Sequence, residues 1–153
     1  YLMYYNNIIQ VEKLDSIIFY KIDRAIRTYR QFAQARLRSL GHQITIDQWL
    51  VIRCLIENPG IQQNEISELV FKDAASVNRM INLLVEAKYL KRKINKTDRR
   101  KMDILVTQKA LDAMEAMDEV IPSNRATALS GLTQEEMQIT TKVMTQIASN
   151  CRK

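Results

Sequence analysis

The chain has 153 residues, of which 46% are hydrophobic and 26% are charged, and its formal net charge is +6 at pH 7. This composition is that of an ordinary globular domain and argues against a disordered or fibrous chain. Neither a run of about 20 apolar residues nor a signal-peptide pattern is present, so we expect a cytoplasmic protein without a membrane partner. Two cysteines are too few for a disulfide framework and lack metal-ligand spacing, so we expect no metal and no cofactor.

Both ends of the chain are predicted to be helical. Apolar residues recur at helical spacing over residues 8–40, and such a helix spans roughly 45 Å, more than one small core covers. Near the other end, Pro122 is expected to end or kink one helix, and Thr133 with Glu136 forms the capping box of the last one. We therefore expect residues 8–40 and 108–153 to form a dimerisation region; a helical pair within one chain is the alternative.

The central segment, residues 45–107, is predicted to hold three helices and a β-hairpin. In chain order we expect a helix capped at Thr45 or Asp47, a short helix at 62–70, a helix at 73–88 with Asp73 as its N-cap, and strands at 89–95 and 101–107. Cys54 lies in an apolar run of the first of these helices, where a buried hydrophobe is expected and a redox-sensing thiol is the sharper alternative. Helix, tight turn, helix and hairpin together make a winged helix-turn-helix.

Positive charge is concentrated in this segment. Residues 72–109 contain eleven lysines and arginines against four acids, a net +7, so the rest of the chain sums to −1. A basic segment inside an otherwise balanced chain is typical of a surface that binds a polyanion. A solvated helix face is the alternative, although such faces usually mix both signs.

The helix expected at 73–88 has two different faces. Its apolar side is predicted to consist of Val77, Met80, Ile81, Leu84, Val85 and Ala87. The opposite side is small and polar, with one arginine and two asparagines, which suits insertion into a groove. The hairpin that follows carries a cluster of cations at its tip, residues 96–100.

These elements resemble the MarR family (multiple-antibiotic-resistance regulators). The matching stretches are 64–69, 75–84, 90–92, 97–100 and 105–107, and the most specific is the Asp-Arg-Arg of the hairpin tip followed by a Val-Thr strand end. The resemblance covers residues 10–150 and implies a mainly α fold with a small β-hairpin and flanking dimerisation helices. The chain departs from the family at Phe71, Lys88 and Ala110, where glycine is usual. A side chain at a left-handed position costs about 1 kcal/mol, so these connections are expected to close differently.

The resemblance and duplex geometry together give candidate DNA-binding residues. They are Lys72, Ala75, Ser76, Asn78, Arg79, Asn82, Lys96, Arg99, Arg100 and Lys101. We expect Arg79 to pair with a guanine edge and Asn78 or Asn82 to pair with adenine. Ser76, the helix N-terminus and Lys72 are expected to hold phosphate.

The cationic tip is expected to reach the minor groove. Arg99 is the first choice for insertion and Arg100 an almost equal one, because narrow A·T stretches concentrate negative potential there. The family resemblance also implies that Asp98 and Arg100 hold the tip by ion pairing.

The expected function is that of a transcriptional regulator, more specifically a repressor that binds a pseudo-palindromic operator as a homodimer. The expected partners are double-stranded DNA, a second copy of the chain and, from the resemblance alone, a small aromatic or anionic effector with no assigned site. An enzyme is disfavoured, because His42 is the single histidine and no phosphate loop or catalytic constellation is present. A winged-helix module for protein–protein contact without DNA binding remains the alternative.

Overall fold

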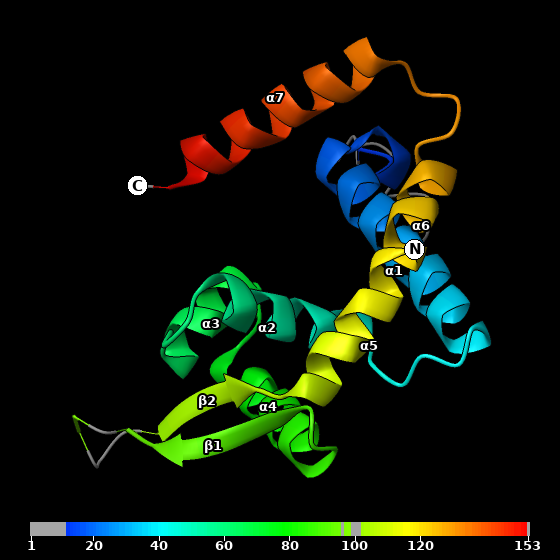
Figure 1. Cartoon of the computed structure of the whole chain (residues 1–153). Helices are drawn as coiled ribbons and strands as arrows, with labels where there is room; N and C mark the ends of the chain where they lie inside the picture. Colours follow the sequence, from blue (N-terminus) through cyan, green and yellow to red (C-terminus); the bar gives the residue numbers. More distant parts are fainter. Residues whose placement is uncertain (1–11, 96, 99–101, 153) are drawn as a thin grey trace, which may run out of the picture. The chain divides into compact units, whose positions relative to one another are not determined.

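The computed structural model describes residues 12–95, 97–98 and 102–152 (Figure 1). Its elements are α1 Ile18–Ser39, α2 Ile46–Glu57, α3 Gln63–Leu69, α4 Ala74–Glu86, β1 Leu90–Ile94, β2 Met102–Val106, α5 Gln108–Asp118, α6 Val120–Ala128 and α7 Gln134–Cys151. They fall into two compact units, one ending at Asp118 and one beginning at Glu119. The expected fold class, mainly α with a small β-hairpin, is confirmed. Within the described ranges, no helix is long and apolar enough to cross a membrane.

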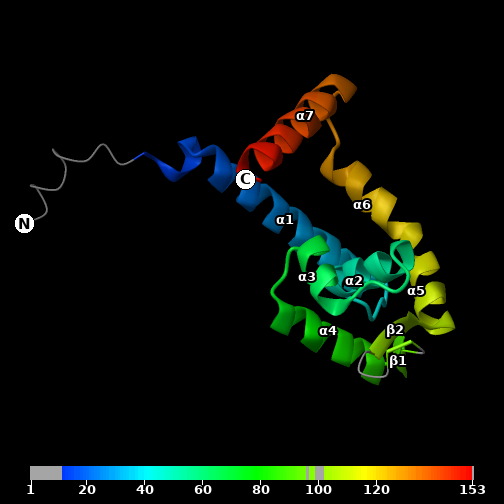
Figure 2. The same ribbon diagram turned by 90° about the vertical axis from the view of Figure 1, so that its left-hand side faces the viewer.

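The first unit contains the helix-turn-helix and its hairpin. Helices α2, α3 and α4 contact one another, β1 lies against α4, and β2 lies against α2 (Figures 1 and 2). The strands are antiparallel, with Leu90 opposite Val106 and Ile94 opposite Met102. The core between these elements is apolar and fully buried; it includes Val51, Ile52, Ile66, Val77, Ile81, Leu84 and Leu90. This core fixes α4 and the hairpin relative to each other.

Side-chain caps start three of the helices where the sequence predicts them. The Thr45 hydroxyl accepts a hydrogen bond from the Gln48 N–H, and the Gln48 side-chain oxygen accepts one from the Thr45 N–H. Asp73 caps α4. Thr133 and Glu136 form the expected capping box of α7, and the backbone and side-chain hydrogen bonds from Thr133 lower the pKa of the Glu136 carboxyl.

Helix α1 starts later than its apolar pattern predicts. Residues 8–11 lie outside the described residues, Leu14–Ser16 form a single 3-10 turn, and Ile17 is extended. The Ser16 hydroxyl donates to the Lys13 carbonyl at 2.6 Å, and such local bonds compete with helix formation. For the described part, the predicted helix start is therefore wrong, and α1 begins at Ile18.

Pro122 does not end a helix. Helix α5 already ends at Asp118, and Pro122 lies in the first turn of α6. A proline is tolerated there because the first-turn N–H groups have no partner within the helix. The sequence correctly marks an interruption in this region but places it about four residues too late.

The three departures from the glycine pattern have two explanations. Phe71 and Lys88 both keep a left-handed conformation, with φ of +53° and +63°. These connections thus retain the geometry that favours glycine, and the expectation that they close differently is wrong. Ala110, in contrast, is a fully buried residue inside α5, where a small side chain fits against the core.

Candidate nucleic-acid interface

Helix α4 divides into a buried and a solvent-facing side, largely as predicted. Val77, Ile81 and Leu84 are fully buried, whereas Met80 and Val85 are only half-buried. Ala87, which was expected on the apolar side, lies past the end of the helix and is exposed. On the opposite side Ala75, Asn78 and Arg79 are exposed, and Ser76 and Asn82 are half-buried. The structure therefore brings the predicted residues of α4 onto one accessible face.

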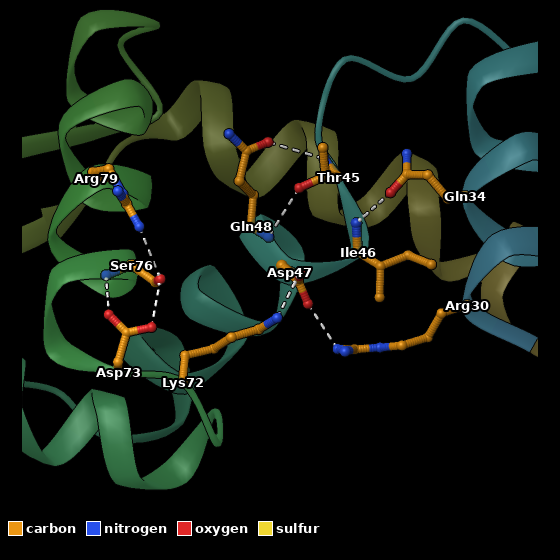
Figure 3. A network of polar contacts seen from close by, with 10 residues as sticks. All are labelled: Arg30, Gln34, Thr45, Ile46, Asp47, Gln48, Lys72, Asp73, Ser76 and Arg79. Atoms are coloured by element: carbon orange, nitrogen blue, oxygen red, sulfur yellow. Dashed lines mark hydrogen bonds and ion pairs between the residues drawn. The ribbon is translucent and has the colours of Figure 1, made fainter. Parts of the chain in front are cut away.

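At the start of α4, three polar residues form a chain of hydrogen bonds (Figure 3). The Ser76 N–H and hydroxyl donate to the two Asp73 carboxylate oxygens at 2.8 and 2.6 Å. Arg79 Nη2 then donates to the Ser76 oxygen at 3.2 Å. These bonds from the Ser76 side chain and backbone lower the pKa of Asp73, which stays ionised at neutral pH.

This arrangement restricts the expected role of Ser76. Both of its donors already engage Asp73, so a phosphate at this position has to displace that carboxylate. Arg79 has most of its guanidinium donors left, because the contact to Ser76 uses one N–H of five.

Lys72 is joined to α1 through α2 (Figure 3). Its ammonium lies 3.1 Å from Asp47 Oδ2, and the other Asp47 oxygen accepts from Arg30 Nη2 at 2.7 Å. Gln34 of α1 adds a second link, because its Oε1 accepts from the Ile46 N–H at 3.0 Å. Lys72 therefore stands beside the start of α4 with its charge partly balanced by Asp47.

Arg92 on β1 is a residue of this surface that the sequence analysis did not single out. Alternate residues of a strand share a face, so Arg92 lies on the side of buried Leu90, toward α4, and Lys91 and Lys93 lie on the other side. Arg92 Nη2 donates to Asn82 Oδ1 at 2.6 Å. The strand period alone would have identified Arg92 as the cation of β1 that faces α4.

The tip of the hairpin is described only in part. Lys96, Arg99, Arg100 and Lys101 lie outside the described residues, and with them the expected pairing of Arg100 with Asp98. On the described side, Asn95 Oδ1 accepts from the N–H groups of Thr97 and Asp98, both at 2.9 Å. Asn95 Nδ2 donates to Asp103 on β2 at 2.8 Å, so Asn95 ties the turn to both strands.

The far end of α4 is held by residues just after β2. The Thr107 hydroxyl lies 2.9 Å from the carbonyl oxygens of Lys88 and Tyr89, and it accepts from the Ala110 N–H at 3.3 Å. Lys109 Nζ donates to the Ala87 carbonyl at 2.8 Å and lies 4.3 Å from the centre of the Tyr89 ring. Thr107 thus caps α5 and also fixes the junction of α4 and β1.

Cys54 is a buried side chain of α2, 7% exposed, as the hydrophobic interpretation predicts. Burial, and to a lesser extent the charge of Glu57, raises the pKa of its thiol. A raised pKa suppresses the reactive thiolate, which disfavours the redox-sensing alternative for this residue. Cys151 is exposed.

A helix-turn-helix followed by a hairpin, with polar residues on the outer face of its second helix, defines a winged helix-turn-helix protein. Residues 42–101, which span α2 to β1, match the model of the MarR family, and this match confirms the expected resemblance. Members of this family are transcriptional regulators and not enzymes.

Several solved structures share the fold of this chain. The MarR protein from Peptoclostridium difficile is 25% identical, with 93% of this chain and 92% of that chain covered and a TM-score of 0.77. MepR from S. aureus, solved as a DNA complex, is 20% identical over 90% of this chain and 99% of its own, with a TM-score of 0.76. BpsR from Bordetella bronchiseptica, whose DNA binding is regulated by 6-hydroxynicotinic acid, is 18% identical over 90% and 96%, with a TM-score of 0.81.

Proposed function

We propose that this chain is a repressor that binds double-stranded DNA as a homodimer at a pseudo-palindromic operator. In this proposal, α4 enters the major groove, and the tip of the hairpin, with Lys96, Arg99, Arg100 and Lys101, reaches the adjacent minor groove. The observation that carries it is the exposed face of α4, where Asn78 and Arg79 stand between small neighbours beside a basic strand. Small residues let the backbone approach the base edges, and the cations of the strand neutralise phosphate charge.

Within this interface the residues have different roles. Arg79 donates to the O6 and N7 acceptors of a guanine, and Lys72 contacts phosphate at the start of α4. Ala75 contributes a small apolar surface, suited to a thymine methyl group.

The apolar faces outside the winged helix support a homodimer. Within α1, all of whose residues are described, Ala33 and Leu37 are the buried ones, whereas Ile18, Phe19 and Ile26 are at least half exposed. Helix α7, also described throughout, buries none of its residues and exposes Ile139, Val143 and Met144. Exposed apolar faces of this kind are usually buried in an interface. A second copy of the chain would bury them and would also place two copies of α4 on the DNA.

A small anionic or aromatic effector is part of the proposal. A hollow of about 390 Å³ lies between α1 and the start of α2, and its lining residues include Asp47 and two residues with guanidinium groups, Arg30 and Arg38. Two such groups favour a carboxylate, and Arg30 is joined through Asp47 to Lys72 beside α4. The regulation of BpsR by 6-hydroxynicotinic acid supports an effector of this chemical class.

The proposal is tested by selecting genomic DNA fragments with the purified protein and measuring their affinity in a salt series. We expect a selected motif with two inverted half-sites about one helical turn apart, and an affinity that falls steeply with salt. Arg79→Ala is expected to cost about 1–3 kcal/mol at one base position of each half-site. A winged helix that serves only protein–protein contact would select no motif.

The matched control is Arg27→Ala, which removes the same charge from an exposed position of α1 paired with Asp23. It should leave the base preference and nearly all of the affinity unchanged. Equal losses for the two variants, spread over all sequences, would contradict the docking of α4.

A further inference from the structure

The hydrogen bond between Arg92 and Asn82 joins the hairpin to the DNA-facing side of α4. Arg92 Nη2 lies 2.6 Å from Asn82 Oδ1, a short and charge-assisted contact. A guanidinium has donors and no acceptor, so the atom of the Asn82 amide that faces it must be the oxygen. The chemistry of the pair therefore fixes which end of the amide points toward β1.

This orientation determines what Asn82 offers to a ligand. Oxygen and nitrogen lie at opposite corners of a planar amide, so with Oδ1 held by Arg92 the Nδ2 group and its two donors point away from the strand. The positive charge also polarises the amide and strengthens those donors. Asn82 in this arrangement presents donors to the groove, and its oxygen is held toward the strand by Arg92.

Adenine is the base that this arrangement does not suit. An asparagine reads adenine with two bonds, one donated to N7 and one accepted by its oxygen from the N6 amino group. When the oxygen points toward the strand, the N6 donors of adenine face the Nδ2 donors of Asn82. Guanine and thymine instead present the carbonyl oxygens O6 and O4 in the major groove, and both accept.

We propose that Arg92 is a positioning residue that makes Asn82 a reader of keto bases, guanine or thymine, and leaves adenine to Asn78. Asn78 is exposed on α4, four residues before Asn82, and so about one turn nearer the start of the helix. The inference rests on the proposed DNA binding and adds to it the base preference of one residue. The sequence predicts Asn78 or Asn82 as the residue that pairs with adenine, and the inference assigns that role to Asn78.

The test is to select DNA sequences from a library with a randomised half-site, using the full-length wild-type protein and the Asn82→Ala variant. The comparison of the two selections identifies the base position that depends on Asn82. We expect guanine or thymine there in the wild type. Arg92→Ala frees the amide to turn, so adenine should rise relative to the keto bases by about 5-fold or more, the equivalent of one hydrogen bond. Asn82→Asp, which keeps the shape and the partner Arg92 but has no donors, should lose the keto preference.

Lys91→Ala is the matched control, because it removes one cation from the same strand on the face opposite to Arg92. It should lower the affinity for all sequences alike and leave the base preference unchanged. An adenine preference in the wild type, or an Arg92→Ala profile like that of Lys91→Ala, overturns the inference while DNA binding stands. If the wild type selects no sequence at all, the proposed function itself fails, and this inference with it.

Discussion

At the scale of single residues, Phe71 and Lys88 adopt a left-handed backbone conformation that residues with a side chain rarely adopt. Phe71 stands in the turn before α4 with φ of +53° and is 87% exposed, so its ring buries almost no surface in the chain. A side chain in this conformation costs about 1–2 kcal/mol, part of which the lower entropy of a non-glycine chain offsets. We expect Phe71→Gly to stabilise the fold by about 0.5–1 kcal/mol, measured by urea unfolding at a fixed protein concentration.

Phe71→Ala separates the two contributions to this effect. It removes the ring and keeps the Cβ atom, so it should leave the free energy of unfolding nearly unchanged. If the glycine variant were no more stable than the alanine variant, backbone strain would not be the cause. Lys88, with φ of +63°, allows the same comparison at the end of α4.

At the scale of elements, the junction of α4, β1 and α5 depends on one hydroxyl. Thr107 contacts the carbonyls of Lys88 and Tyr89 and caps α5 through the Ala110 N–H. Thr107→Val keeps the shape and removes these bonds, so it should destabilise the fold by about 1–3 kcal/mol in urea unfolding. Thr107→Ser keeps the hydroxyl and should lower the free energy of unfolding much less. Equal unfolding midpoints for the Thr107→Val variant and the wild type would show that the junction does not need the hydrogen bonds of the Thr107 hydroxyl.

The positions of the helices and strands are the part of the fold that the sequence predicts best. The contacts between these elements are the part that it does not predict. Hydrophobic periodicity and caps locate α4 and both strands to within two residues, because α4 and β1 bury residues in the same core and β2 pairs with β1. The break after Asp118 was misplaced, since proline is compatible with both a helix start and a helix end. The contacts of Arg92 with Asn82 and of Asn95 with Asp103 join different elements. A pattern along one chain shows which face a residue occupies, but not which partner stands opposite it.

At the scale of the whole molecule, the proposed dimer places a requirement on α7. At 100° per residue, Val143 and Met144 lie on its apolar side, and both are more than one third exposed in the single chain. Aspartates at these two positions would have to be buried without partners in a dimer, which costs several kcal/mol. We expect Val143→Asp with Met144→Asp to change the mass in solution, measured by light scattering, from twice 17.8 kDa to that of one chain.

The loss of the dimer should also change DNA binding, and its effect should differ from that of replacing a DNA-contacting residue. Two linked half-site contacts gain about 100-fold or more over one, because the second is intramolecular. The double variant should therefore lose this factor on a full operator and bind a single half-site as the wild type does. Gln138→Asp with Ser149→Asp adds the same two charges on the opposite side of α7 and should leave both mass and affinity unchanged. A double variant of Val143 and Met144 that remains dimeric would place the interface on α1, whose exposed Ile18, Phe19 and Ile26 would be the next positions to change.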